Sequence, residues 1–121
     1  MRIISGIYRG KKLIAPKSLP VRPTTDFAKE GLFNMLNNRI DFEGIAVLDL
    51  FAGTGNISLE FASRGAQLIT SVDADRGCIN YIRKTAEELN CNCIRPLRGD
   101  VFSFVQKNFG QFDVIFADPP Y

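Results

Sequence analysis

Hydrophobic and polar positions change their spacing once along this chain of 121 residues, close to residue 45. The first stretch, "RIISGIYRGKKLIAP", has the pattern of two short strands with a turn at Arg9–Gly10. "KSLPVRPTT" contains two prolines and no helical period, so we expect an extended linker. A helix should begin at Thr25 or Asp26, which are good N-cap residues. Its apolar stripe consists of Ala28, Leu32, Met35, Leu36 and Ile40.

Beyond residue 45, apolar segments typical of strands alternate with segments of helical period. Four strands are expected, in "IAVLDLF", "QLITSVD", "CIRPL" and "FDVIFAD", although Pro96 limits the pairing of the third. Three helices are expected between them, in "NISLEFASRG", in residues 76–90 and in "VFSFVQKNF". This order predicts an α/β fold with a doubly wound, mainly parallel sheet and right-handed crossovers. In such a sheet we expect the first and fourth strands to be neighbours.

Composition narrows the class of protein. With 45% hydrophobic and 23% charged residues, the chain has the balance of an ordinary globular domain. Its apolar runs are far shorter than the ~20 residues that span a bilayer, so no membrane contact is expected. "MRIISGIYRGKK" lacks the apolar core of a secretory signal, and Cys78, Cys91 and Cys93 are therefore expected as reduced thiols of a cytoplasmic protein. Because the chain has no histidine, we expect no metal site.

Charge divides the chain into two parts. Residues 1–25 contain six basic side chains and no acid, whereas residues 26–121 contain nine basic and thirteen acidic ones. We therefore expect a basic N-terminal hairpin arm with its linker over 1–25, and a mildly acidic body over 26–121. A basic arm of this kind favours a polyanionic partner, but a solvated hairpin without a ligand would show the same pattern.

The most informative loop follows the first expected strand, in "DLFAGTGNISLE". Gly53 and Gly55 lie at a strand-to-helix turn, where glycine permits positive φ and where open α/β sheets bind ligands. A dinucleotide fingerprint would require a third glycine where Ser58 stands. Asp49, four residues before Gly53, would repel a pyrophosphate and attract an ammonium group. The loop thus favours S-adenosylmethionine over NAD, although plain turns also have this composition.

Two further aspartates follow the next strands. Asp73 ends the second strand, where a carboxylate can accept hydrogen bonds from both hydroxyls of a ribose. Asp100, in "RGDVF", can accept from an adenine amino group or can cap the helix that follows it.

The motif "FADPPY" follows the fourth strand and should lie beside the glycine loop. The Asp118 carboxylate and the Pro119 carbonyl can accept the two hydrogens of an exocyclic base amine, whose lone pair is otherwise delocalised into the ring. Pro119 and Pro120 stiffen the turn and remove N–H donors, and Tyr121 can stack on the base. An ordinary strand-ending turn could also carry the first three of these residues.

With these motifs in place, a resemblance becomes evident. "DLFAGTG" followed by "DPPY" resembles the class I S-adenosylmethionine-dependent amino-methyltransferases, which have a Rossmann-like sheet. "RIISGIYRGKKL" and "RPTTDFAKEGLFNML" narrow it to the RsmD family of 16S rRNA guanine-N2 methyltransferases. The resemblance covers the whole chain. It implies a cytoplasmic enzyme that methylates the exocyclic amine of one guanine in 16S rRNA or the small ribosomal subunit.

The resemblance also implies roles for individual residues. The methyl donor would be held by Asp49, Phe51, Gly53, Gly55, Asp73 and Asp100. The guanine would be held by Asp118, Pro119, Pro120 and Tyr121. The rRNA phosphates would be contacted by Arg2, Arg9, Lys11 and Lys12, and the entrance lined by Arg22, Thr24 and Thr25.

One departure from the family concerns length. Members of the family continue for several strands and helices after the DPPY motif, so this chain is expected to be incomplete. Its fourth strand would then be an exposed edge, which favours self-association. Two other functions stay open on the sequence alone: methylation of DNA adenine or of protein glutamine, and binding of donor or RNA without turnover.

Overall fold

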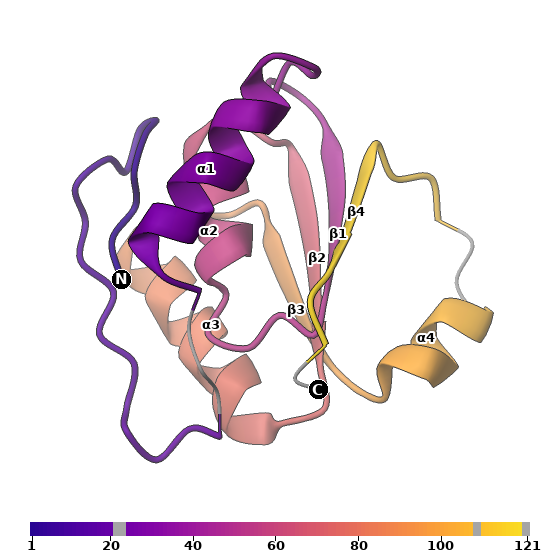
Figure 1. Cartoon of the computed structure of the whole chain (residues 1–121). Coiled ribbons are helices and arrows are strands. Elements are labelled where there is room, and N and C mark those ends of the chain that lie inside the picture. Colours follow the sequence, from indigo (N-terminus) through magenta and orange to yellow (C-terminus); the bar gives the residue numbers. More distant parts are fainter. Residues whose placement is uncertain (21–23, 108–109, 120–121) are drawn as a thin grey trace.

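The centre of the molecule is a four-stranded parallel sheet in the order β3-β2-β1-β4, seen in a computed structural model (Figure 1). The structure describes residues 1–20, 24–107 and 110–119. The strands are β1 (Ala46–Leu50), β2 (Leu68–Asp73), β3 (Ile94–Arg98) and β4 (Val114–Ala117). The helices are α1 (Asp26–Asn37), α2 (Asn56–Ser63), α3 (Arg76–Glu88) and α4 (Val101–Lys107). The alternating order predicted from the sequence is thus confirmed.

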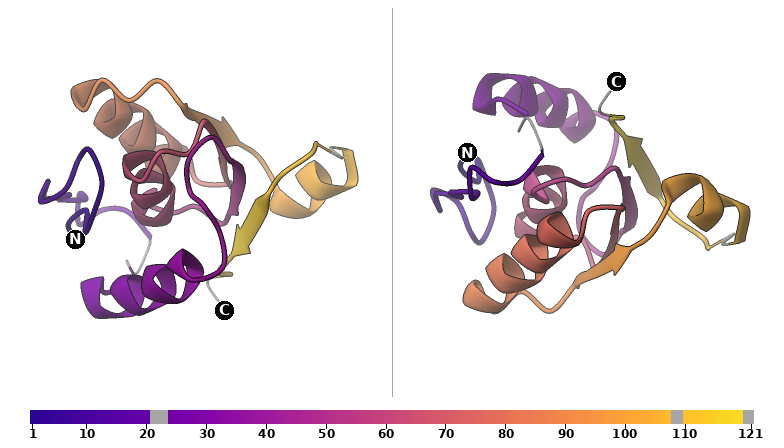
Figure 2. Two further views of the ribbon diagram at one scale, coloured as in Figure 1. Left: turned by 90° about the horizontal axis from the view of Figure 1, so that it is seen from above. Right: turned by 90° about the horizontal axis from the view of Figure 1, so that it is seen from below.

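Helices lie on both faces of the sheet, with α1, α2 and α3 on one face and α4 on the other (Figures 1 and 2). Strand side chains alternate between faces, so Val47 packs into the first layer and Leu48 into the second. Phe33, Phe42 and Phe61 stabilise the first layer, with ring centroids 4.8–5.9 Å apart. The predicted doubly wound architecture is therefore confirmed.

The position of β1 in the sheet determines where a ligand can bind. After β1 the chain builds β2 and β3 on one side, and then returns through α4 to place β4 on the other side of β1. Asp49 therefore pairs in register with Ser71 of β2 and with Phe116 of β4. Ligands of open α/β sheets bind at such a reversal of strand order, beyond the carboxyl ends of the strands.

The N-terminal arm, residues 1–20, is less regular than the two strands predicted for it. It contains one antiparallel bridge, between Arg2 and Lys12. The amides of Ile4 and Ser5 donate to the Glu60 carboxylate, at 2.9 and 3.1 Å, and not to an opposing strand. A regular ladder is therefore replaced by contacts with α2.

Helix α1 begins where it was predicted, because the Thr25 hydroxyl accepts a hydrogen bond from the Ala28 amide at 3.1 Å. Its predicted apolar stripe is wrong at two positions, since Ala28 and Met35 are exposed. The buried side chains are Phe33 and Lys29, and the second is a charged residue that no hydrophobic pattern would place inside. In the part of the chain that the structure describes, no helix is both long and apolar enough to cross a membrane.

Candidate active site

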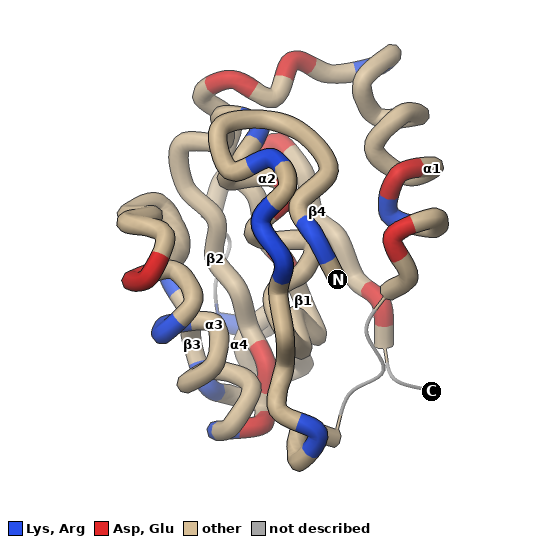
Figure 3. The backbone as a smooth tube through the Cα atoms, turned by 90° about the vertical axis from the view of Figure 1, so that its left-hand side faces the viewer, with Lys and Arg blue, Asp and Glu red and all other residues tan. Residues whose placement is uncertain are grey.

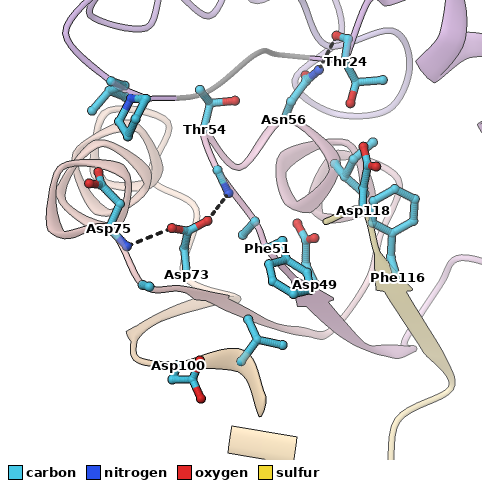
Figure 4. A pocket seen from close by; sticks show the side chains of 17 residues that line it. Thr24, Asp49, Phe51, Thr54, Asn56, Asp73, Asp75, Asp100, Phe116 and Asp118 are labelled. Carbon is cyan, nitrogen blue, oxygen red and sulfur yellow. Dashed lines mark hydrogen bonds between the residues drawn. The ribbon is translucent and has the colours of Figure 1, made fainter. Parts of the chain in front are cut away.

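A cavity of about 850 Å³ opens at the carboxyl ends of the strands (Figure 4). Its described lining includes no lysine or arginine. Five aspartates line it: Asp49, Asp73, Asp75, Asp100 and Asp118. Such a surface favours a ligand that carries positive charge and hydroxyl or amino donors, and disfavours a phosphate.

Asp49 lies at the floor of this cavity and is almost completely buried. The Ser58 hydroxyl donates to Asp49 Oδ2 at 2.6 Å, and the hydroxyls of Ser58 and Ser71 are 2.6 Å apart. Burial raises the pKa of Asp49 to about 7, against the opposing effect of the Ser58 hydrogen bond, and the charges of Asp73 and Asp118 raise it further. A cation entering the cavity would therefore favour ionisation of Asp49.

The glycine loop between β1 and α2 is held by Asp73. Phe51, Gly53 and Gly55 all have positive φ, between 57° and 78°. The Gly53 amide donates to Asp73 Oδ2 at 2.9 Å, and the Asp75 amide donates to Oδ1 at 2.9 Å. The Asp73 carboxylate thereby connects the loop that follows β1 with the loop that follows β2 (Figure 4).

The two glycines of this loop have different surroundings. Gly53 lines the cavity together with Phe51. Gly55 is not part of the lining, and a Cβ atom at this position would lie 2.8 Å from Ile82 Cγ1. Gly55 therefore permits close packing of α2 against α3, so that its effect on the cavity is indirect.

Asp100 lies at the end of β3 and serves the helix after it. Its Oδ2 accepts from both the amide and the hydroxyl of Ser103, each at 3.0 Å. The capping alternative is thus observed, and the same carboxyl group also belongs to the cavity lining.

Asp118 comes directly after β4 and lines the cavity on the side opposite Asp73 (Figure 4). Its position follows from the pairing of β4 with β1, because the preceding Ala117 lies in register with Leu50. Unlike Asp49, Asp118 is exposed. Of the remaining catalytic candidates, Pro119 is partly buried, and Pro120 and Tyr121 lie outside the described residues.

The RNA-contact candidates fall into two groups. Arg9, Lys11 and Lys12 are exposed, and Figure 3 shows basic positions spaced along the N-terminal arm. Arg2 is also exposed, and its Nε lies 3.7 Å from an Asp26 carboxylate oxygen. These four positions are accessible from solvent, as contact with RNA would require.

The other three candidates precede α1 in the sequence. Thr24 lines the cavity, and its carbonyl accepts from the Asn56 side-chain amide at 3.1 Å. Thr25 caps α1, which gives it a structural role, and Arg22 lies outside the described residues. Leu19 and Pro20 also line the cavity, and no sequence pattern had indicated either residue.

A buried charged cluster beside the cavity, which no sequence pattern had indicated, is formed by Lys29, Glu60 and Arg64. Lys29 Nζ lies 3.2 Å from Glu60 Oε1, and it donates to the Asn56 side-chain oxygen at 2.7 Å and to the Arg2 carbonyl at 2.6 Å. Arg64 Nε donates to Glu60 Oε2 at 2.8 Å. Burial lowers the pKa of Lys29, and the Glu60 carboxylate opposes this effect. The cluster joins the arm, α1 and α2.

Comparison with known proteins gives a consistent result. The family model described as Conserved hypothetical protein 95 matches residues 1–121. The protein named ribosomal RNA small subunit methyltransferase D in Haemophilus influenzae is 36% identical, over 100% of this chain and 64% of that protein. The putative rRNA methyltransferase YlbH of Bacillus subtilis is 37% identical, over 100% of this chain and 67% of its own length.

The fold is also found among solved structures. The putative methyltransferase yhhF from Escherichia coli matches with a TM-score of 0.88 and 33% identity, over 100% of this chain and 64% of that one. The chain thus spans about three fifths of the length of the first curated relatives, with 64% and 60% covered.

Proposed function

Because the chain belongs to the family described as Conserved hypothetical protein 95, we propose that it transfers a methyl group from S-adenosylmethionine to 16S rRNA. We further propose that the acceptor is the exocyclic N2 amine of a guanine. Family membership confirms the resemblance to the RsmD family that was inferred from the sequence. The substrate class is supported by the relatives' name, ribosomal RNA small subunit methyltransferase D.

The observation that carries this proposal is the cavity lined by five aspartates and by no described basic side chain. S-adenosylmethionine supplies an electrophilic methyl group on a sulfonium, and it also carries an ammonium group and no phosphate. Asp49 is placed to attract the ammonium group from the floor of the cavity. Asp73 retains lone pairs for ribose hydroxyls beyond its two backbone hydrogen bonds.

The acceptor side of the site is assigned to the residues after β4. Asp118 is exposed, reaches the same cavity as Asp49, and can accept a hydrogen bond from an amine that enters there. The Pro119 carbonyl can accept the second amine hydrogen, since proline cannot donate from its nitrogen. Hydrogen bonds from both amine hydrogens to these two acceptors favour a more pyramidal and more nucleophilic nitrogen. Most of the rate enhancement would come from alignment of the reacting atoms.

The N-terminal arm is assigned to the RNA backbone. Its exposed basic side chains can contact phosphates and so position the nucleic acid without selecting a base. The target guanine must leave its base stack to reach Asp118. This costs least for a nucleotide that is already unpaired.

Transfer of labelled methyl groups tests the proposal. The protein is incubated with labelled S-adenosylmethionine and small ribosomal subunits that lack the modification, with naked DNA as the parallel acceptor. The proposal predicts label in 16S rRNA, recovered after digestion as N2-methylguanine, and none in DNA. Label in DNA alone, or in protein glutamine, would show that the protein is an amino-methyltransferase of another class. If calorimetry detected donor binding but no acceptor were methylated, the protein would be a binding protein without turnover.

A further inference from the structure

A second reactive cluster lies at the opposite end of the sheet from the candidate active site. Cys91 and Cys93 follow α3 and precede β3, and their sulfur atoms are 3.5 Å apart. Tyr8 of the N-terminal arm reaches the same place, where its hydroxyl interacts with Cys91. The proposed methyl transfer uses none of these three side chains.

The groups around Cys91 favour its thiolate. The Cys93 thiol is the strongest influence that lowers the pKa of Cys91, and the backbone amides of Cys93 and Ile94 and the Tyr8 hydroxyl act in the same direction, against burial. Hydrogen bonding to Cys91 and burial raise the pKa of Cys93, and burial raises the pKa of Tyr8 to about 12. Cys93 and Tyr8 therefore hold their protons more tightly than Cys91 does.

The remaining thiol, Cys78, has contrasting surroundings. It is fully buried, and burial raises its pKa to about 12. Cys91 borders a surface cavity of about 480 Å³ that is also lined by Arg83, Glu87 and Asn90. A small polar reagent can thus approach Cys91, whereas Cys78 has no such access in the described part of the structure. Cys78 serves as an internal control.

A metal site would need more ligands than this cluster offers. Among the described residues, no group of three or more histidine, cysteine, aspartate or glutamate side chains is arranged to hold an ion. Two adjacent thiols, one of them poised as a thiolate, suit redox chemistry better, because the thiolate is the nucleophile and the second thiol can resolve the oxidised product.

We propose that Cys91 and Cys93 form a peroxide-reactive dithiol, in which Cys91 is oxidised first and Cys93 resolves it to an intrachain disulfide. The Cys91 thiolate attacks one oxygen of hydrogen peroxide, the O–O bond breaks, and hydroxide leaves and takes up the proton that the Cys91 thiol released to solvent when it ionised. The product is the Cys91 sulfenic acid. Cys93 then attacks its sulfur, the S–O bond breaks, and water leaves with the Cys93 proton. Two thiols are oxidised and one peroxide is reduced to two waters.

The disulfide would be short-ranged and reversible. One residue, Asn92, separates the two cysteines, and the sulfurs already touch, so little chain movement is needed to begin closure. A ring this small departs from relaxed disulfide geometry, and strained disulfides are reduced more readily. A dithiol reductant should therefore restore both thiols.

The test uses the full chain with stoichiometric hydrogen peroxide at neutral pH, followed by intact and peptide mass analysis. The wild type and the Cys78→Ser control should both lose two hydrogens and yield a peptide with Cys91 linked to Cys93. In Cys93→Ser, a sulfenic acid trap should label Cys91 on the order of tenfold or more faster than Cys78. Addition of a dithiol should reverse the linkage.

Three results would overturn the proposal: equal labelling of Cys78 and Cys91, an intermolecular product in place of the internal link, or labelling of Cys93 in Cys91→Ser as fast as that of Cys91 in Cys93→Ser. Circular dichroism of each variant before oxidation shows that it is folded. Because these readouts do not involve methyl transfer, their outcome is separate from that of the proposed function.

Discussion

Two groups of charged residues contact α2, one through Glu60 and the other through Ser58, and they are built in opposite ways. In the buried cluster, Glu60 faces Lys29 and Arg64 and also accepts the amides of Ile4 and Ser5. In the cavity, four of the five aspartates accept hydrogen bonds from backbone amides or serine hydroxyls, and no described basic side chain lines the cavity. In the first group each charge faces an opposite charge, whereas the second has no opposite charge among the described residues that line the cavity.

The difference separates a structural use of charge from a binding use. A buried ion that keeps all its partners stabilises the arrangement around it, and it becomes costly when one partner is removed. Carboxylates that face a cavity without a cation raise one another's pKa, as Asp73 and Asp118 do for Asp49, and this repulsion is relieved when a cationic ligand binds. We therefore expect mutations in the first group to affect folding and mutations in the second to affect ligands.

The largest effect is expected for Glu60→Ala. The change leaves the Lys29 ammonium buried without its carboxylate and also removes the acceptor for two arm amides. Loss of one partner of a buried pair costs about 3–5 kcal/mol of unfolding free energy. Urea denaturation measures it, with the exposed Glu30→Ala on α1 as the matched control. If Glu60→Ala lowered the unfolding free energy by less than about 1 kcal/mol, the buried cluster would not be more important for folding than the cavity aspartates.

Asp118→Ala is expected to separate transfer from donor binding. Asp118 is exposed, so its replacement should leave stability unchanged. Loss of one positioned group at the reacting atom should lower kcat about 10²–10³-fold. Single-turnover methyl transfer and donor calorimetry measure the two quantities. Equal loss of donor binding would show that Asp118 belongs to the donor side.

Asp49→Asn should weaken donor binding about 10–100-fold, the usual range for one charge-assisted hydrogen bond. The wild-type affinity should also increase as pH rises through about 7, because Asp49 must ionise to pair with the ammonium group. The variant should lack this increase. Calorimetry between about pH 5.5 and 7.5 avoids most of the titration of an α-amino group. An identical pH profile in both proteins would exclude Asp49 from the ammonium site.

Without donor, the ionisation of Asp49 is expected to lower the stability of the wild type, an effect that Asp49→Asn removes. The folded-state pKa of Asp49 is raised to about 7 from 3.8, so its contribution to stability is fully present below the unfolded value and is lost as pH rises through the folded value. Relative to Asp49→Asn, the wild type should therefore lose stability between about pH 4 and 7. Thermal unfolding of both proteins without donor across this range checks the direction.

The smallest effect is expected at the arm. Combined replacement of Arg9, Lys11 and Lys12 by alanine should leave unfolding unchanged, because all three side chains are exposed. When the logarithm of the rRNA binding constant is plotted against the logarithm of the salt concentration, the slope should become shallower by about 0.7–0.9 for each lost phosphate contact. A matched control replaces the exposed Arg39, Arg83 and Lys84, which lie outside the arm. Equal changes in slope for the two triple variants would mean that the arm has no special role.

Sequence patterns were sufficient for most of the sheet. The positions of Asp49, Asp73, Asp100 and Asp118 near strand ends followed from hydrophobic runs that have an acidic residue at or close to their ends. Their meeting in one cavity followed from the parallel order, which brings all carboxyl ends to one edge. Local pattern and global topology agree here, so little tertiary information was needed.

Patterns were insufficient where a tertiary contact decides the outcome. Lys29 is buried because Glu60, 31 residues later in the chain, faces it, and no property of α1 alone indicates this. The arm is irregular because two of its amides donate to the same distant carboxylate. Gly55 looked like a ligand contact, and its proximity to Ile82 of α3 could not be inferred from the loop itself.

The central claim is that the acidic cavity serves a cationic donor, and a paired calorimetric titration tests it most directly. The protein is titrated with S-adenosylmethionine and, under the same conditions, with NAD, which carries a pyrophosphate. Our account predicts saturable binding of one S-adenosylmethionine per chain, weakened in Asp49→Asn, and no measurable binding of NAD. Binding of NAD as tight as that of S-adenosylmethionine, or binding of S-adenosylmethionine by Asp49→Asn as tight as by the wild type, would contradict it.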